Sequence, residues 1–420
     1  MRLVLLSLAA MLVAAPSGYA TTPGPGSVPG PGPDAARLEA DFLAFDPGYV
    51  EARRKRTDAT RTLAATLIRG ERKGRVNTCA HQILFEVISL IPTSADFERI
   101  DERIAALQAA MTAPQDDRPD ADGLWGSCFN QWYLKLYATY DRLSTQGAPP
   151  TEPQPLPAFL EPVATPEKLR RRLEALAVSD VRTTGLDHGR EYNETLSVLI
   201  RMLVHGRPQN YSPDPALRQA LLDIVAQQQD PATGFWGQQY RQEDGFRFGG
   251  DLSTTFHVIS YLRGEVPNWP RIIETTLAVR DYDYPQGWRW RGRYWNHMSM
   301  DVVTIFQYAW PHATADQRAR MTTEIEAMLA WCLTESLQAD GSFEPSLADG
   351  SSQDSQYYGA SFLARIGYFD PARRFWTDRE FPEAAEVRER ILKYVRAQVG
   401  TGSSAGYSGV FEALGASPTP

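Results

Sequence analysis

The hydrophobic pattern along the chain is that of helices. Apolar residues recur at three- to four-residue spacing, and the alternation typical of strands is almost absent. Segments that are apolar on nearly all sides, which we expect to be buried, alternate with segments that carry more charge. The apolar helices are predicted at 79–90, 129–143, 192–204, 251–263, 296–310 and 354–366, and the charged ones at 96–111, 167–176, 216–229, 269–280, 315–337 and 383–399, with part of 34–68 before them.

A loop that contains glycine and an aromatic or apolar residue precedes the apolar helices. Two of the loops are followed by polar inserts, at 238–250 and 344–353. A polar residue then opens each apolar helix, so the unit that repeats is a helical hairpin. The clear loops are Asp122–Cys128, Thr233–Gly237, Tyr284–Trp288 and Asp340–Phe343, and weaker copies occur at Thr184–Asp187 and around Asn77.

Six such hairpins, laid side by side, can close into a ring with the apolar helices inside. A linear solenoid is the alternative, but it would show a more regular period and polar end caps. The irregular spacing and the long inserts favour the ring. We therefore predict an all-α fold, an (α/α)6-type toroid of helical hairpins, in a single domain at 34–420.

Two of the loops carry a resemblance to known toroids. The segments Gln229–Gly237 and Gln338–Phe343 resemble the repeat of terpene-cyclase and prenyltransferase toroids, and that of α/α-toroid polysaccharide lyases of the glucuronan and alginate lyase type. The resemblance implies a toroid over most of the chain. The Asp-x-Asp-Asp motif of the cyclases is absent from the sequence and prenyltransferase zinc ligands are not evident, so the resemblance supports the fold more than an activity.

The first 33 residues are expected to lie outside the fold. Residues 1–20 have the features of a signal peptide: Arg2, a short apolar run at 3–13, and small residues at 17–20. A retained membrane anchor is the alternative, but the run is too short to span a bilayer. Residues 21–33 form a Pro/Gly linker. We predict a periplasmic or secreted protein without a stable membrane anchor.

The net charge limits the classes of binding partner, and the cysteine content limits the disulfides and metal sites. The net charge of −8 and a pI near 5.4 argue against nucleic acid, although a local basic site could still bind an anionic ligand. Cys79 and Cys128 lie in similar contexts and could form a disulfide, whereas Cys332 is expected to be a buried thiol. No Cys/His spacing typical of zinc sites occurs. We expect no metal, no cofactor and a monomer.

The candidate site residues lie mainly in the loops before the apolar helices, which the ring would place on its inside. In a toroid these helices run in the same direction, so their N-termini, which attract anions, meet at one mouth. The segment 288–297 alternates arginines with aromatic residues, which suits carboxylates and sugar rings. Solvated arginines and packing aromatics are the structural alternative. The substrate-binding candidates are Arg289, Arg291, Arg293, Trp236, Trp288, Trp290, Asp251, Tyr358 and Glu344.

The sequence favours a polysaccharide lyase that cleaves an anionic, uronate-containing polysaccharide by β-elimination. Such an enzyme must neutralise the carboxylate, remove the C5 proton and protonate O4, which Asn, His, Arg and Tyr side chains can do. Toroid lyases use sets of these residues, and this chain has a similar one. We expect Tyr294 as base and acid, His257 or His297 as partner base, Asn193 or Asn296 as neutraliser, and Arg291 or Arg293 as the carboxylate clamp.

Structural roles remain open for several of these residues. Asp251 could be only a helix N-cap, His257 only a core histidine, and Asp301 could orient His297 from one turn away. A glycoside hydrolase that uses two carboxylates is the alternative enzyme, and a non-catalytic carbohydrate-binding envelope protein is the third possibility. The carboxylates available to a hydrolase are Asp251, Asp301, Glu344 and Asp354.

Overall fold

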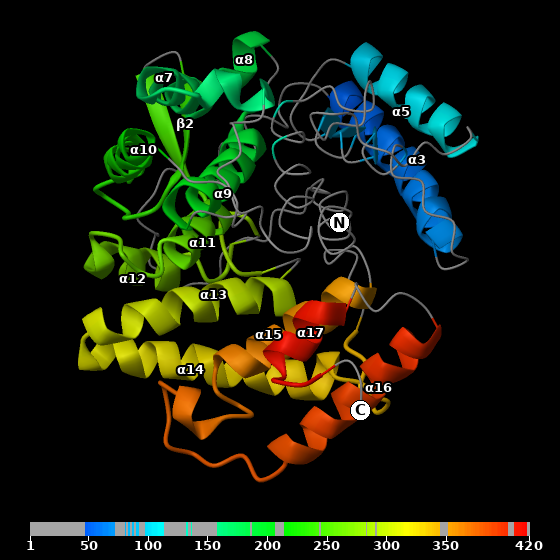
Figure 1. Ribbon diagram of the computed structural model, residues 1–420, viewed down its shortest axis with the longest axis vertical. Helices are drawn as coiled ribbons and strands as arrows, with labels where there is room; N and C mark the ends of the chain where they lie inside the picture. The colour runs from blue at the N-terminus through cyan, green and yellow to red at the C-terminus, as the bar shows by residue number, and fades with distance from the viewer. Residues whose placement is uncertain are drawn as a thin grey trace.

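The structure is a computed structural model of the 420-residue chain. It describes residues 47–71, 97–112, 158–184, 187–205, 214–242, 245–282, 284–289, 292–344, 352–401 and 407–417, with further helical positions between 80 and 91 and at 132 and 136. Over these residues the chain is mainly helical, which confirms the predicted all-α class. In Figure 1 the elements from α7 to α16 follow one another around an arc.

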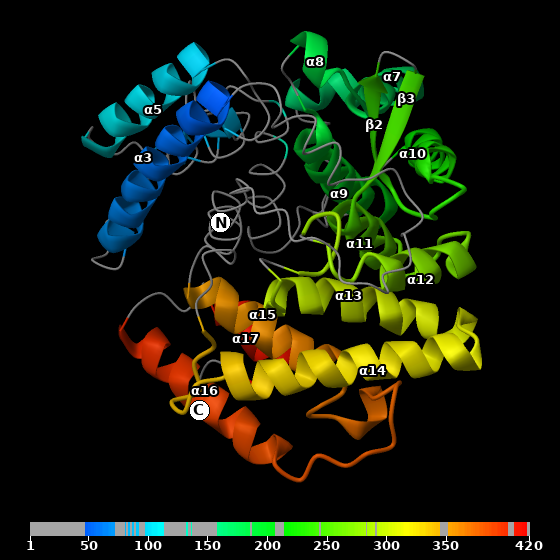
Figure 2. The same cartoon turned by 180° about the vertical axis from the view of Figure 1, so that it is seen from behind.

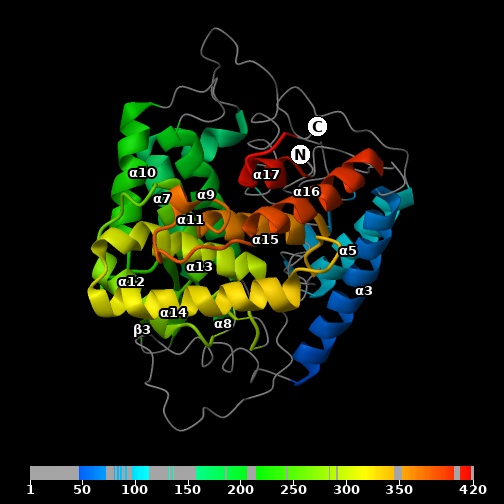
Figure 3. The same cartoon turned by 90° about the horizontal axis from the view of Figure 1, so that it is seen from below.

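Apolar and charged helices alternate as the sequence predicts. The apolar helices contact one another in chain order, from α9 to α11, α13, α15 and the short α17, and we call α9, α11, α13 and α15 the inner helices. α14 runs alongside α13, with α15 also next to α13 (Figures 2 and 3). The inner helices and α17 span Gly189–His205, Leu252–Tyr261, Asn296–Ala309, Ser352–Arg365 and Ser408–Ala413; α7, α10, α12, α14 and α16 span Pro166–Leu176, Pro215–Gln228, Trp269–Ala278, Ala315–Trp331 and Ala384–Thr401.

The charged helices begin at residues that satisfy their free N–H groups. Thr165 and Asp214 accept backbone N–H bonds at the starts of α7 and α10, and a proline follows each of them. Thr314 forms a capping box with Gln317 at the start of α14, in which each side chain accepts a bond from the other's backbone. Local sequence therefore sets where these helices start.

A second, smaller core lies near the N-terminal side of the described chain. It joins α3 (Pro47–Glu71) and α5 (Phe97–Thr112) to helical positions at 80–91, with buried side chains that include Leu67, Val87 and Ile104. This core shares no buried residue with the main core, which extends from Leu136 to Leu414.

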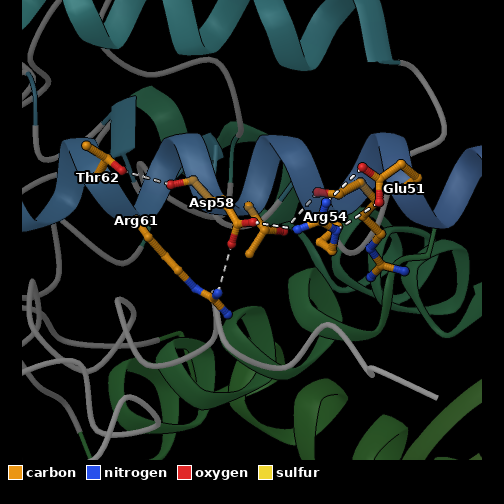
Figure 4. A network of polar contacts seen from close by, with 7 residues as sticks. Glu51, Arg54, Asp58, Arg61 and Thr62 are labelled. Carbon is orange, nitrogen blue, oxygen red and sulfur yellow. Dashed lines mark hydrogen bonds and ion pairs between the residues drawn. The ribbon is translucent and has the colours of Figure 1, made fainter. Parts of the chain in front are cut away.

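The solvent-facing side of α3 carries a series of ion pairs (Figure 4). Arg54 bonds Glu51 at 2.8 Å and Asp58 at 3.2 Å, and Arg61 bonds Asp58 at 3.0 Å. Thr62 Oγ1 donates to the backbone oxygen of Asp58 at 3.1 Å. These pairs join solvent-accessible residues three or four apart on one helix, so water screens them and each adds little to stability.

A small sheet departs from the helical prediction. The predicted polar insert at 238–250 is a hairpin of β2 (Gly237–Gln242) and β3 (Gly245–Gly250), with β1 (Val178–Ser179) parallel to β2. Gly237 and Gly250 are paired, and a Cβ at Gly237 would lie 2.0 Å from the oxygen of Gly249. Gly237 is therefore needed for the close approach of the two strands.

The remaining short elements connect the helices. They are α8 (Val181–Thr184), the 3-10 turns at Ala158–Val163, Trp310–His312 and Pro371–Arg373, and a π-helical turn at Cys332–Ser336. Cys332 is a buried free thiol, as predicted. The predicted signal peptide and linker, and the proposed Cys79–Cys128 pair, lie outside the described residues. None of the described helices combines the length and apolarity that crossing a membrane requires.

Candidate functional site

The aromatic residues of the repeat loops anchor inner helices to outer ones. The indole N–H of Trp236 donates to the carbonyl of Val225 in α10, and that of Trp288 donates to Thr276 in α12, both at 2.8 Å. Both tryptophans have an exposed fraction of 0%. The prediction that they bind substrate is wrong, because fully enclosed rings with satisfied indoles cannot stack on a sugar.

Polar side chains join the first turns of α9 and α11. Asn193 donates from Nδ2 to Ser253 Oγ at 3.1 Å, and its Oδ1 lies 2.8 Å from Nδ1 of His257. All three residues belong to the first two turns of their helices. Because Arg201 also contacts Tyr261 near the other ends of these helices, α9 and α11 run side by side in the same direction.

The contact with Asn193 fixes the tautomer of His257. An amide oxygen only accepts hydrogen bonds, so the imidazole Nδ1 carries the proton and Nε2 keeps its lone pair. Burial, and then the charges of Arg201 and His297, lower the pKa of His257 to about 3. The ring is therefore neutral at physiological pH and stays partly exposed. His257 thus has an Nε2 lone pair that can accept a proton.

The network continues from α11 to α13 through Tyr284. Tyr284 hydrogen-bonds to Ser253, and its hydroxyl donates to Asp301 Oδ2 at 3.1 Å. Burial, followed by the charge of Asp301, raises the pKa of Tyr284 well above its usual value. Tyr284 is thus a neutral donor that links Asn193 and His257, through Ser253, to Asp301 of α13.

His297 connects α13 to α15. Its ring stacks on Tyr358, with centroids 4.1 Å apart and planes inclined by 13°. Its Nε2 lies 3.8 Å from Asp301 Oδ2, which agrees with the expected orienting contact although it is too long for a hydrogen bond. Burial lowers the pKa of His297 to about 4. One polar network therefore spans the N-terminal halves of four successive inner helices, and we call it the inner polar network: Asn193, Ser253, His257, Tyr284, His297, Asp301 and Tyr358.

Asp251 adjoins the inner polar network, and Asp301 is the carboxyl within it. Asp251 caps α11 by accepting the Thr254 N–H at 2.7 Å, which confirms the capping role considered for it. Burial raises the pKa of Asp251 to about 7 despite its bonds to Thr254. Burial also raises the pKa of Asp301 well above its usual value, and Asp251 adds to that shift. Both acids bind protons more readily than exposed aspartates.

An arginine lies close to His257. His257 stacks on Tyr261, with centroids 5.5 Å apart, and the guanidinium of Arg201 lies 4.8 Å from the Tyr261 ring centre. Arg201 also donates from Nε to the Ser197 carbonyl at 3.2 Å. Its charge is near enough to lower the pKa of His257. The positively charged guanidinium of Arg201 thus lies near the neutral imidazole of His257.

Tyr294, the predicted catalytic base, is placed in a different cluster. Its hydroxyl donates to Glu324 Oε2 of α14 at 3.2 Å, and the Arg289 guanidinium lies 3.6 Å from its ring centre. Glu324 also pairs with Arg280 at 3.0 Å, and Arg289 lies 3.8 Å from Asp281. The structure therefore places Tyr294 and Arg289 with α12 and α14, in contacts separate from those of the inner polar network.

The other residues predicted for the site do not form a common cluster. Asn296 is buried and donates to Ser336 Oγ at 2.8 Å, so it binds the π-helical turn that follows α14. Arg293 and Glu344 are exposed, and the Glu344 N–H donates to the Ser336 carbonyl at 2.7 Å. Trp290 and Arg291 lie outside the described residues.

The sequence analysis did not select Tyr284 and Ser253 of the inner polar network, or Arg201 beside it. Tyr284 begins a repeat loop, where the glycine and tryptophan drew attention instead. Arg201 follows Asn193 at i+8, on the same side of α9, and this spacing could have identified it. Ser253 lies beside the cap residue and has no sequence signal of its own.

Comparisons with other proteins do not identify a function for this chain. The sequence shows no significant match to a protein-family model, to a curated protein or to a solved structure. Within the described part of the chain, no three His, Cys, Asp or Glu side chains are grouped so as to hold a metal ion. The inner polar network therefore has to be interpreted from its own chemistry.

Proposed function

We propose that the protein is a polysaccharide lyase that cleaves a uronate-containing polysaccharide by β-elimination, with His257 as the base. One observation carries the proposal: a neutral imidazole whose Nδ1–H is held by Asn193 at 2.8 Å and whose Nε2 keeps its lone pair. A base needs an available lone pair at working pH, and this arrangement supplies one.

The elimination balances with residues of the inner polar network and one arginine. His257 Nε2 takes the C5 proton, the electrons of that bond form the C4–C5 double bond, and the C4–O4 bond breaks. The imidazolium then returns the proton to O4 on the same face of the sugar. Arg201 stabilises the negative charge that develops on the carboxylate. Asn193 acts as a positioning residue for the base, and Tyr284 keeps Asp301 from competing for that role.

The direct test replaces the base. His257→Gln keeps a polar side chain of similar reach but removes the imidazole, and His312→Gln is the matched control because His312 is exposed on a 3-10 turn. Alginate, glucuronan, pectate and glycosaminoglycans are incubated with each protein, and the ultraviolet absorbance of the unsaturated product is read together with reducing ends. We expect the control to match wild type and His257→Gln to lose 100-fold or more, in the range of about 10²–10⁴ for general base catalysis. Full activity in His257→Gln would refute the proposal.

The positioning role of Asn193 is tested through the pH profile. Asn193→Asp would place a carboxylate against Nδ1 and so raise the pKa of His257, because an adjacent negative charge favours the imidazolium. The acidic limb of the activity profile should then move to higher pH. A merely structural role would lower activity at every pH without displacing that limb.

We further propose that the hairpins close into an (α/α)6 toroid in a single domain. Support comes from the alternation of apolar and charged helices, from inner helices that contact one another in order, and from the arc in Figure 1. In such a ring the first turns of the inner helices would face one mouth. Small-angle scattering that requires an extended solenoid would exclude it.

Glycoside hydrolysis is the second candidate, favoured by the raised pKa of Asp251. A carboxyl with a pKa of about 7 suits a general acid, and the charge of Asp251 is near enough to Asp301 to raise the pKa of that second carboxyl. New reducing ends without ultraviolet absorbance, lost in Asp301→Asn and retained in His257→Gln, would establish this reaction in place of elimination.

A further inference from the structure

One side of α9 forms a polar stripe that leads to the base. Arg190, Asn193, Ser197 and Arg201 are spaced by three, four and four residues, which places them on the same side of the helix. Asn193 holds His257, so this side faces α11 and the inner polar network. Arg190, in the first turn, stands at the N-terminal end of the stripe.

The guanidinium of Arg190 is shielded from solvent and has no hydrogen-bond partner among the described residues. Its Nε, Nη1 and Nη2 are all buried, and none of them forms a hydrogen bond there. Arg172 shows the contrast: its Nε is also unbonded, but its Nη2 bonds Glu191. A guanidinium has five N–H donors, and leaving all of them unsatisfied away from water is strongly unfavourable. Such a group in a folded protein calls for an anion.

The acid one turn further along α9 does not supply that anion. Glu194 lies one turn after Arg190, and burial raises its pKa although Arg190 and Arg201 act to lower it. Among the described residues, no carboxylate lies within ion-pair distance of Arg190. Arg190 and Arg201 are thus two positive charges near Glu194, which ionises less readily than usual. The stripe therefore keeps a net positive charge.

We propose that Arg190 binds the carboxylate of a uronate residue of the substrate, next to the sugar on which His257 acts. The proposal rests on the proposed function and adds the site that selects for acidic sugars. A guanidinium presents two parallel N–H groups that match the two oxygens of a carboxylate, so binding there is specific in geometry as well as in charge. Neutral polysaccharides gain nothing from this contact and retain the cost of the unpaired cation.

The test measures equilibrium binding apart from turnover. All proteins carry His257→Gln, and glucuronate tetrasaccharide is titrated calorimetrically beside its carboxyl-free counterpart, cellotetraose; galacturonate and mannuronate tetrasaccharides complete the set. Arg190→Gln removes the cation, Arg190→Lys keeps the charge without the fork, and Arg218→Gln, exposed on α10, is the matched control. Thermal unfolding is recorded for each protein without ligand.

We expect Arg190→Gln to weaken binding of at least one uronate tetrasaccharide about 10- to 100-fold, the effect of a charge-assisted hydrogen bond, with Arg190→Lys intermediate. Cellotetraose binding should not change. Without ligand, Arg190→Gln should unfold at the same or a higher temperature, because it removes an unpaired buried cation.

Three outcomes would overturn the inference. Unchanged uronate binding in Arg190→Gln removes the site but leaves the lyase proposal intact, since that is decided by elimination in the otherwise wild-type protein. A lower unfolding temperature with equal loss of charged and neutral sugars assigns Arg190 a structural role. Absence of uronate binding in every protein also rejects the site, and the ultraviolet assay then decides the function separately.

Discussion

Replacing Asp251 with Asn should make folding more stable at neutral pH, although it alters a helix cap. Burial raises the pKa of Asp251 to about 7, against about 4 for an unfolded aspartate. Because the folded pKa is the higher one, the folded state binds a proton more tightly between these values. Stability therefore falls as pH rises from about 4 to about 7, and the deficit is complete above pH 7.

The magnitude follows from the size of the shift. Three pKa units correspond to an upper limit of about 4 kcal/mol, at 1.36 kcal/mol for each unit. The side chain keeps partial contact with solvent, which screens the charge, so we expect about 2 kcal/mol. Asparagine caps helices about as well as aspartate, and the bond to the Thr254 N–H can be kept. The gain should thus be near zero at pH 4 and about 2 kcal/mol at pH 8.

Urea unfolding between pH 4 and 8.5 measures this difference. Asp214→Asn is the control, because Asp214 also caps a helix, accepting the Ala216 N–H at 2.8 Å, but is exposed. Its effect should stay within about 0.5 kcal/mol, without a pH trend. If the wild-type and Asp251→Asn curves run parallel across the pH range, the assigned pKa shift is wrong. If Asp251→Asn destabilises at pH 8, the carboxylate is held by more favourable contacts than those described.

Three further predictions concern packing. Trp288→Ala should lower the free energy of unfolding by about 3–5 kcal/mol, because the ring is fully buried against Phe306; a loss below 1 kcal/mol in urea titrations would mean that it does not anchor the core. Gly341→Ala should cost about 2 kcal/mol or more, since φ is +91° and a Cβ would lie 2.2 Å from the carbonyl of Arg390; an unchanged melting temperature would contradict the geometry. The thiol of Cys332, whose pKa is raised by burial, should resist alkylation until the protein unfolds; peptide mass spectrometry showing native-state labelling would contradict its burial.

The two candidate reactions share one structural requirement, a polar network inside an apolar layer of helices. Ser253 and Asp301 are almost completely buried, yet each is hydrogen-bonded within the network. Polar residues at such positions cost stability unless they are paired. Their presence on successive inner helices is therefore more consistent with a retained function than with packing alone.

Several features of the fold follow from local sequence. The charged segment predicted at 269–280 is α12 at Trp269–Ala278, and the segment predicted at 315–337 is α14 followed by a π-helical turn. These predictions succeed because helix periodicity and caps act within a few residues. The hairpin at Gly237–Gly250 was missed because its stability comes from pairing across strands and with β1, which the local pattern does not reveal.

The candidate site was predicted only in part, for the same reason. The polar positions at the starts of the inner helices, Asn193, His257 and His297, are joined in one network as their equivalent places in the repeat suggest. Tyr294 lies in a loop just before α13, and the path of that loop turns its hydroxyl toward α14. Helical periodicity says nothing about the direction of a side chain outside a helix.

By itself the sequence determined that the chain forms alternating apolar and charged helices, with loops of a repeated type between them. It did so because backbone hydrogen bonding, capping and amphipathic spacing are local properties. Only the tertiary structure decided that Trp236 and Trp288 are core anchors, that Tyr294 binds Glu324, and that Asn193 fixes the proton of His257. Those outcomes depend on which helix lies opposite each side chain, and burial and hydrogen-bond partners come from residues distant in the sequence.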